Sequence, residues 1–360
     1  MGIPAHPGVG LKATTVPFRR AFRPIVATAL AVLAGATTPT RSVAQESHAL
    51  LVVGLGGSPE YRTTFHGWAT GLRDALVALG VPPGNVVHLG EGESPGVDGA
   101  STREGLRQAV TAMAGRAGPN DRILVVLIGH GTSQGNEASF NLPGPDVSPA
   151  EMAALLDGAF GQRPVAVVNT TPASGPFVGA MSGENRVVVT ATRTAQERNE
   201  TRFGQFFVEA LEGDAADLDK DGRLSLLEVF QYASSEVARH YEEENLILTE
   251  HAMLDDNGDG EGSSEPGTDT PDGMFSSTFW VGATRVAAAS GAGAAVTLDS
   301  IADPVLRGLY EDKATIENQI AGLRLRREQM ETEAYEAALE ELLVQLALKN
   351  REIQAREGEG

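Results

Sequence analysis

Short apolar runs recur along the first two thirds of the chain, and stretches of helical periodicity separate them. The runs predict buried strands at 49–54, 86–89, 123–129, 164–169 and 186–192. Between them, apolar residues return every three or four positions, which indicates helices at 65–80, 101–118 and 148–160. Ser101 and Glu104 have the spacing of a capping box at the start of the second helix. Strands that are apolar on both faces are typical of a mostly parallel sheet covered by helices on both sides. We therefore expect an α/β fold with its site at the carboxyl ends of the strands.

The pattern changes near residue 203. A helix is expected there, and the stretch 217–245 then runs from an acidic loop into a longer helix. The stretch 255–273 is acidic, glycine-rich and irregular, and 276–282 has the composition of a last edge strand. These features predict an α/β domain over 45–285 that carries both acidic loops, followed by a flexible linker over 286–300.

Residues 301–360 are highly charged and helical in pattern throughout. Their apolar positions follow three-four spacing with a one-residue slip, in the two sets Ile316, Ile320, Leu323, Met330 and Tyr335, Leu339, Leu342, Leu346, Ile353. This spacing predicts a coiled coil or an antiparallel hairpin of helices. A single amphipathic helix packed on the globular domain fits it equally. Such a tail would suit a homo-oligomer, docking on another protein or self-packing.

The amino terminus has the layout of a signal peptide. Basic residues at 18–23 precede an apolar run at 24–36, and the small-x-small sequence SVA ends at Ala44. The apolar run is shorter than the ~20 residues that a bilayer span needs, so an uncleaved anchor is the weaker interpretation. We expect residues 1–44 to be removed and the protein to be periplasmic or secreted, with no transmembrane span after cleavage.

Composition narrows the chemistry further. The chain has 48 acidic and 28 basic residues, and its formal net charge is −20. A surface of this sign repels nucleic acid and favours cations, divalent ones especially. The chain contains no cysteine, which excludes disulfides, thiolate nucleophiles and cysteine metal sites.

The sequence DLDKDGRLSLLE at 217–228 has a candidate ligand at each ligand position of a twelve-residue calcium loop, and Gly222 stands where the loop must turn sharply. Calcium takes six to eight hard oxygen ligands, and carboxylates packed this closely would repel one another without a cation. The alternative is a solvated acidic turn before a helix. Gly213 and Asp214 should end the preceding helix early, so a loop with only an exiting helix is expected. The predicted ligands are Asp217, Asp219, Asp221, Arg223 (through its carbonyl), Ser225 and Glu228.

A second, weaker candidate begins at residue 255. Asp255, Asn257 and Asp259 stand at the first, third and fifth ligand positions of the same pattern. Pro266 stands where the bidentate glutamate belongs, so Asp256 or Glu265 would have to serve instead. Otherwise the stretch is a flexible acidic loop.

Three segments resemble the caspase–legumain superfamily of cysteine peptidases. They are the strand ending in GHG at 124–131, NTTPASG at 169–175 and RVVVTAT at 186–192. In that superfamily a His-Gly pair ends one strand, and a cysteine in an Ala-Cys-x-Ser-Gly-like segment ends the next. The resemblance covers roughly 48–285, and TEHAMLDDNGDGEG at 249–262 is similar to bacterial legumain-like proteins. It implies a caspase-like sheet, with His130 at the catalytic histidine and Gly131 at the glycine whose N–H helps to form the oxyanion hole.

The resemblance also places Pro172 at the nucleophile. Proline has neither a thiolate nor a backbone N–H, so it can supply neither the attacking group nor an oxyanion donor. The sequence therefore favours an exported, calcium-binding pseudopeptidase that binds a peptide or protein partner. An active hydrolase that uses the hydroxyl of Ser174 or Thr171, with His130 as base, is the first alternative. A structural envelope protein assembled through the C-terminal helices is the second.

Overall fold

The computed structural model describes residues 2, 45–92, 96–213, 215–219, 223–282, 285–286, 296–297, 303–325 and 331–357. The expected signal peptide at 1–44 therefore lies outside the described residues, apart from Gly2, as does most of the expected linker at 286–300. The predicted calcium ligand Asp221 lies outside them too.

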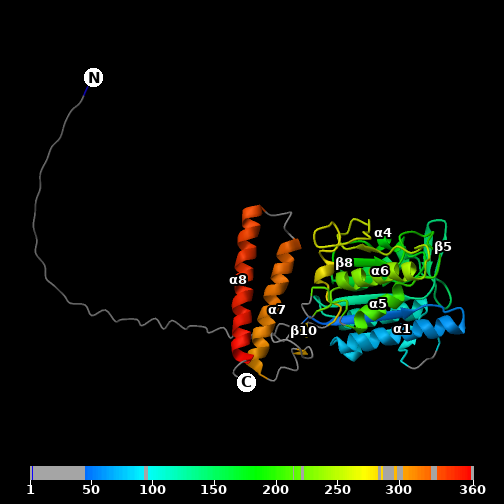
Figure 1. Ribbon diagram of the computed structural model, residues 1–360, viewed down its shortest axis with the longest axis horizontal. Coiled ribbons are helices and arrows are strands. Elements are labelled where there is room, and N and C mark those ends of the chain that lie inside the picture. Colours follow the sequence, from blue (N-terminus) through cyan, green and yellow to red (C-terminus); the bar gives the residue numbers. More distant parts are fainter. Residues whose placement is uncertain are drawn as a thin grey trace, which may run out of the picture. The chain divides into compact units, whose positions relative to one another are not determined.

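A sheet packed among helices organises the chain between Ser47 and Asp255 (Figure 1). It has seven strands in the order β3-β2-β1-β4-β7-β8-β9. Neighbouring strands run parallel except at the β9 edge, where β9 pairs antiparallel with β8. The strands are β1 (Ser47–Val53), β2 (Val86–Gly90), β3 (Gly99–Ala100), β4 (Arg122–Ile128), β7 (Val165–Asn169), β8 (Arg186–Thr190) and β9 (Met253–Asp255). The expectation of a mostly parallel sheet is confirmed.

Helices cover both faces of this sheet, because alternate residues of the apolar strands point to opposite sides. In β1, Leu51 and Val53 join the hydrophobic cluster under α1, α5 and α6, whereas Leu50 and Val52 join the cluster under α2, α3 and α4. All four side chains are at most 1% exposed. The helices are α1 (Pro59–Ala78), α2 (Arg103–Arg116), α3 (Pro149–Phe160), α4 (Phe177–Met181), α5 (Phe203–Glu212) and α6 (Leu226–Glu243).

Local signals set most helix boundaries, with one correction. Ser148 and Glu151 form a reciprocal capping box at the start of α3. The capping box expected at Ser101 is wrong, because Thr102 caps α2 by accepting a hydrogen bond from the amide of Gly105. Helix α5 ends at Glu212, as Gly213 predicted.

The expected edge strand at 276–282 is also wrong. Residues Ser276–Thr278 form the short 3-10 helix η2, and Trp280 makes an isolated bridge to Ser225. The strand at the sheet edge is instead β9. The sequence pattern did not predict it, because it has three residues and only Leu254 is both apolar and fully buried. The hairpin of β5 (Gly131–Gln134) and β6 (Glu137–Phe140) also lacks an apolar run that would have predicted it.

The tail contains two helices, α7 (Pro304–Leu325) and α8 (Thr332–Glu357). Lys349 pairs with Asp312 at 3.1 Å and Arg356 pairs with Asp303 at 2.7 Å, so the two helices run antiparallel. Buried Tyr310 and Ile353 share a small hydrophobic cluster between them. Two further pieces complete the described secondary structure, the 3-10 helix η1 (Pro83–Asn85) and the pair of β10 (Arg285–Val286) with β11 (Val296–Thr297).

Candidate functional site

The segments that carry the peptidase-like residues meet at the carboxyl edge of the sheet. Strands β4 and β7 are neighbours with Leu127 opposite Asn169, so the loops that follow them start side by side. A Cβ added to Gly131 would lie 2.1 Å from the carbonyl oxygen of Pro172 and 2.7 Å from the hydroxyl of Thr171. Only glycine fits there, which fixes the two loops against each other.

The imidazole of His130 is held on the side of α1. Its Nε2 lies 3.2 Å from the carbonyl oxygen of Gly56. The ring packs edge-on against Tyr61 and Phe65, with centroids 4.7 Å and 5.1 Å away. A carbonyl oxygen can only accept, so the neutral ring that makes this contact carries its proton on Nε2. Any base chemistry by His130 would fall to Nδ1.

The hydroxyl of Thr171 belongs to the loop itself. It donates to the side-chain oxygen of Asn169 at 2.8 Å, and the amide of Thr171 donates to the same oxygen at 3.1 Å. Thr171 is 1% exposed and Asn169 is fully buried. The bonded group therefore closes a turn at the end of β7 and is shielded from solvent.

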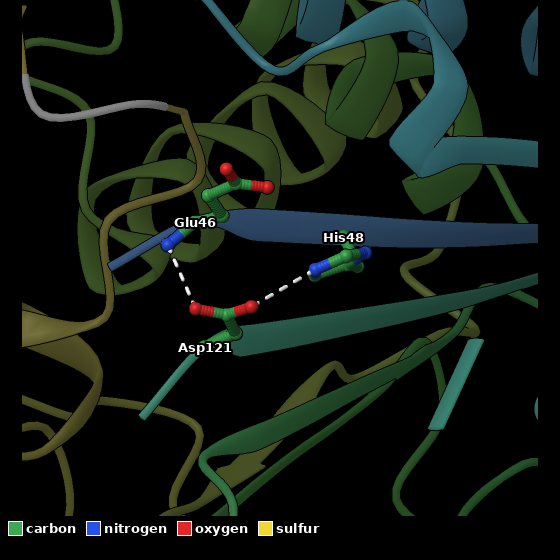
Figure 2. A group of neighbouring side chains, drawn as sticks. All are labelled: Glu46, His48 and Asp121. Carbon is green, nitrogen blue, oxygen red and sulfur yellow. Dashed lines mark hydrogen bonds and ion pairs between the residues drawn. The ribbon is translucent and has the colours of Figure 1, made fainter. Parts of the chain in front are cut away.

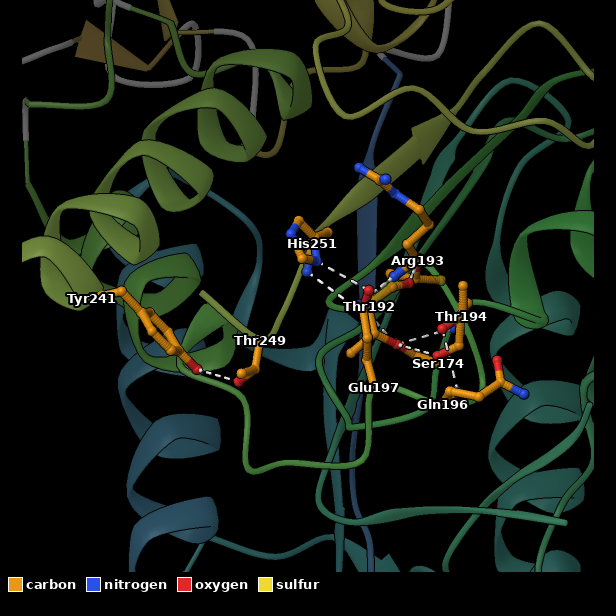
Figure 3. A network of polar contacts seen from close by, with 11 residues as sticks. Ser174, Thr192, Arg193, Thr194, Gln196, Glu197, Tyr241, Thr249 and His251 are labelled. Atoms are coloured by element: carbon orange, nitrogen blue, oxygen red, sulfur yellow. Dashed lines mark hydrogen bonds and ion pairs between the residues drawn. The ribbon is translucent and has the colours of Figure 1, made fainter. Parts of the chain in front are cut away.

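The hydroxyl of Ser174 faces the end of β8 and not His130. Its Oγ lies 3.1 Å from the hydroxyl oxygen of Thr192, and it accepts a hydrogen bond from the amide of Thr192 at 3.2 Å (Figure 3). The amide of Gly175 donates to the same Thr192 hydroxyl. Ser174 is 1% exposed and Thr192 is fully buried. These bonds tie the loop after β7 to the loop after β8.

Neither Pro172 nor Ala173 has a backbone N–H left to offer to an oxyanion. Pro172 has no N–H, and the amide of Ala173 donates to the carbonyl oxygen of Glu197 at 2.7 Å. Ala173 has a φ of 55°, a left-handed backbone conformation that residues other than glycine rarely adopt. The tight turn at 172–174 is thus held in place by a bond to a segment some twenty residues further on.

A carboxylate–imidazole pair lies at the same edge and was not foreseen. Oε1 of Glu197 is 3.0 Å from Nδ1 of His251, and Oε2 accepts the amides of Arg193 and His251 at 3.1 Å each (Figure 3). The pair joins the loop after β8 to the segment that leads into β9. Glu197 and His251 are 54 residues apart, so no local pattern could have paired them.

The acidic loop at 217–228 brings three of its predicted ligands together. Carboxylate oxygens of Asp217, Asp219 and Glu228 all lie within 4.8 Å of one another, so this cluster could hold a metal ion. Glu228 is buried, and its carboxylate accepts the amides of Leu218 and Ser225 at 2.9 Å each. Ser225, predicted as a ligand, donates its hydroxyl to Glu228 at 2.7 Å and caps α6. The convergence of charge is the one that the spacing predicts.

The exit of this loop is anchored to the end of the α/β domain. The amide of Leu226 donates to the carbonyl of Phe279, and the amide of Val281 donates to the carbonyl of Leu224, both at 2.9 Å. The guanidinium of Arg223 lies 5.1 Å from the centre of the Trp280 ring, a cation–π contact. The apolar residue at position eight of the loop, Leu224, is 8% exposed and belongs to the main core.

The second acidic stretch is built differently. Asp255 accepts the amides of Gly258 and Gly260 at 3.1 and 3.0 Å, and it is 1% exposed. Asn257 and Asp259 bond each other at the exposed tip. The three predicted ligands are thus engaged with the loop's own groups, and the metal-ligating clusters of the described residues do not include them.

Hydrogen bonds of Asp256 and Asp272 join the two ends of the same stretch. Asp256 accepts the amides of Gly273 at 2.9 Å and Ser276 at 2.6 Å, and Asp272 accepts the amide of Asp256 at 3.2 Å. Burial raises the pKa of Asp272 to about 6, and the nearby carboxylates of Asp256, Asp255 and Asp259 add to the rise. The amide of Asp256 opposes it only in part.

A further group that could hold a metal ion lies at the opposite edge of the sheet. Glu46, His48 and Asp121 each offer a ligand atom within 4.8 Å of the others. Asp121 lies between the amide of Glu46, 2.9 Å away, and Nε2 of His48, 3.1 Å away (Figure 2). Burial raises the pKa of Asp121, but the amides of Glu46 and Gly118 and the imidazole together hold it below its ordinary value. Asp121 thus joins the amino ends of β1 and β4.

Comparison with known proteins adds little to this geometry. No family model matches the chain, and no curated protein matches it. Among solved structures, protein GSU0716 from Geobacter sulfurreducens is similar at 13% identity and a TM-score of 0.37. That similarity covers 58% of this chain and 92% of the other. Within the described residues, no helix is long and apolar enough to cross a membrane.

Proposed function

We propose that the chain is an exported, calcium-stabilised, caspase/legumain-like pseudopeptidase, which binds peptide or protein segments at the carboxyl edge of its sheet without cutting them. The proposal rests on the observation that the candidate nucleophilic hydroxyl groups are buried and already hydrogen-bonded. Those of Thr171 and Ser174 are 1% exposed and bonded to Asn169 and Thr192, while the His130 imidazole bonds the carbonyl of Gly56.

Catalysis by acyl transfer needs a nucleophile within reach of its base and donors for the developing oxyanion. The chain has no cysteine, and the position that the resemblance assigns to the nucleophile is Pro172. Loss of one oxyanion donor alone costs about 10²–10³ in rate. The hydroxyls of Thr171 and Ser174 and the amides of Thr171, Ala173 and Gly175 are already hydrogen-bonded within the protein, which supports a binding role over a hydrolytic one.

The same edge keeps a surface on which an extended segment could lie. Leu55 is 39% exposed and precedes Gly56, whose carbonyl bonds His130. The half-buried side chains of Tyr61 and His130 pack against each other. Apolar and aromatic side chains around one imidazole are a typical setting for peptide recognition. The adjacent placement of His130 and 170–175 directly after the neighbouring strands β4 and β7 supports the caspase/legumain-like assignment.

The metal-binding part of the proposal rests on the convergence of Asp217, Asp219 and Glu228. We assign calcium because the oxygen-only donor set and the spacing of the loop, which also includes Asp221, the Arg223 carbonyl and Ser225, suit a hard cation. Binding would bring the carboxylates onto one ion and so fix the start of α6 against 279–281. In an exported protein, which meets high calcium, this is a structural site.

The test is incubation of the purified protein with a mixed peptide library in calcium, with retained and cleaved peptides identified by mass spectrometry. The expected result is retention without cleavage, with retention reduced in Tyr61→Ala. Arg116→Ala, an exposed change at the end of α2, is the matched control and should retain peptides as wild type does. Cleavage that disappears in His130→Ala would overturn the proposal in favour of a hydroxyl-dependent hydrolase.

A further inference from the structure

Helix α8 has one face turned to α7 and another that the hairpin leaves exposed. Tyr335, Leu339, Leu342 and Leu346 are half-buried and Ile353 is buried, which accounts for the apolar spacing of this part of the sequence. The ion pair of Lys349 with Asp312 holds the same side of α8 to α7.

The exposed face carries a second apolar stripe. Leu343, Val344 and Leu348 are 46%, 53% and 56% exposed, and Ala347 is also exposed. Three- and four-residue spacing places these residues on one side of the helix. A shallow, almost entirely apolar groove runs along it, lined by Glu336, Leu339, Glu340, Leu343, Val344 and Ala347. A contiguous exposed stripe of this kind marks an interaction surface.

The residues of the stripe are spaced symmetrically about its midpoint, with apolar residues matched to apolar residues and an acidic residue matched to a basic one. Its members are Glu340, Leu343, Val344, Ala347, Leu348 and Arg351, and their spacing is symmetric about the midpoint between Gln345 and Leu346. An identical helix laid antiparallel across that midpoint would place Leu343 opposite Leu348 and Val344 opposite Ala347. Glu340 would face Arg351 at both ends. A two-fold interface requires this self-complementarity.

We propose that the outer face of α8 binds a second copy of this chain, antiparallel, with the two-fold axis between Gln345 and Leu346. Two hairpins joined in this way form a four-helix assembly in which the apolar stripe is covered. Acidic Glu336 and Glu340 at one end argue against an anionic lipid surface as the occupant. A parallel pair would set Glu340 against Glu340 and Arg351 against Arg351.

The interface is small, so the association should be concentration-dependent. Helix α8 has 26 residues and is about 39 Å long, but its outer apolar stripe has only four members. An interface of this size supports a dissociation constant on the order of micromolar.

Sedimentation velocity of the full chain from about 1 to 200 μM tests the proposal. Wild type should convert from monomer to dimer. Glu340→Arg and Arg351→Glu should each weaken the dimer at least about tenfold, because each change sets like charges opposite one another. An equimolar mixture of the two variants, and the double variant, should dimerise as wild type does. A monomer at every concentration, or single variants that dimerise normally, would overturn the proposal.

Disulfide trapping checks the orientation, and the cysteine-free chain gives it no background. A mixture of Leu343→Cys and Leu348→Cys chains should form the mixed disulfide faster than either chain links to itself. Faster self-linking of each variant would show a parallel pair and contradict the proposed axis. Far-UV circular dichroism of all variants should match wild type, and so should their melting temperatures at concentrations where wild type is a monomer, since the exposed face takes no part in folding one chain.

Discussion

The acidic loops at 217–228 and 255–273 start from almost the same spacing of side chains, yet they arrange their carboxylates differently. In 217–228, Asp217, Asp219 and Glu228 converge to within 4.8 Å of one another. In 255–273, Asp255 and Asp256 instead accept hydrogen bonds from four separate backbone amides, those of Gly258, Gly260, Gly273 and Ser276. An acidic motif therefore points to a cation only where several of its carboxylates converge on one point.

The polar groups at the carboxyl edge of the sheet resemble those of 255–273, because they are hydrogen-bonded separately to other parts of the protein. The hydroxyls of Thr171 and Ser174 and the imidazole of His130 all have partners within the protein. At 217–228, by contrast, three carboxylates gather in one place, which is the arrangement that a cation would need.

The largest effect should come from removing calcium. At a calcium concentration about 100 times the dissociation constant, binding stabilises the fold by about 2.7 kcal/mol, so a chelator should lower the melting temperature by several degrees. Glu228→Gln should abolish most of the difference between calcium and chelator, as measured by calorimetry. Asp259→Asn in the other loop is the matched control and should keep it. An equal loss in both variants would erase the distinction between the two loops.

Asp256→Ala should destabilise the protein whether or not calcium is present. It removes the acceptor of two buried amides, those of Gly273 and Ser276, at a cost of about 2 kcal/mol. Chemical denaturation in calcium and in chelator measures this, with Asp269→Ala at an exposed position of the same loop as the neutral control. A loss that calcium repairs would mean that 255–273 is a cation site after all.

Asp272→Asn should stabilise the protein near neutral pH. The folded-state pKa of Asp272 is about 6, above its ordinary value of 3.8, so the folded state holds the proton more tightly. Its stabilising contribution is therefore complete below about pH 4 and is lost as the pH rises through 6. Asparagine keeps the oxygen that accepts the amide of Asp256. The variant should gain on the order of 1–2 kcal/mol at pH 7.5 and nothing near pH 4. A gain that does not depend on pH would contradict the buried charge as its cause.

Ser174→Ala should cost about 1 kcal/mol of stability, because it breaks the bonds that join the loops after β7 and β8. Thr192→Val should cost a similar amount, and the double variant should cost less than the sum of the two, since both changes remove the same contact. Denaturant unfolding of the four proteins measures this coupling. Simple additivity would show that the Ser174 hydroxyl does not lock the loops.

Much of this architecture could be read from the sequence, because buried parallel strands are apolar on both faces. The runs at 49–54, 123–129, 164–169 and 186–192 became β1, β4, β7 and β8 with small shifts of boundary. Short elements were missed for a physical reason. Strand β9 and the β5–β6 hairpin are held by pairing with distant segments, and their own residues carry little hydrophobic signal.

The candidate sites also differ in how far the sequence could predict them. The convergence at 217–228 followed from spacing along a single loop, which is a local property. The partners of Ser174, Glu197 and Asp256 lie 16 to 54 residues away and depend on which strands are neighbours. Sequence spacing alone could place Ser174 near the end of β7, but it could not show that the hydroxyl faces Thr192.

The central claim is that the carboxyl edge binds without catalysing, and peptide turnover tests it most directly. Wild type and His130→Ala are incubated in calcium with the same peptide library, and new termini are counted by mass spectrometry. We expect no turnover by either protein above the uncatalysed background. Turnover by wild type that His130→Ala removes would contradict it.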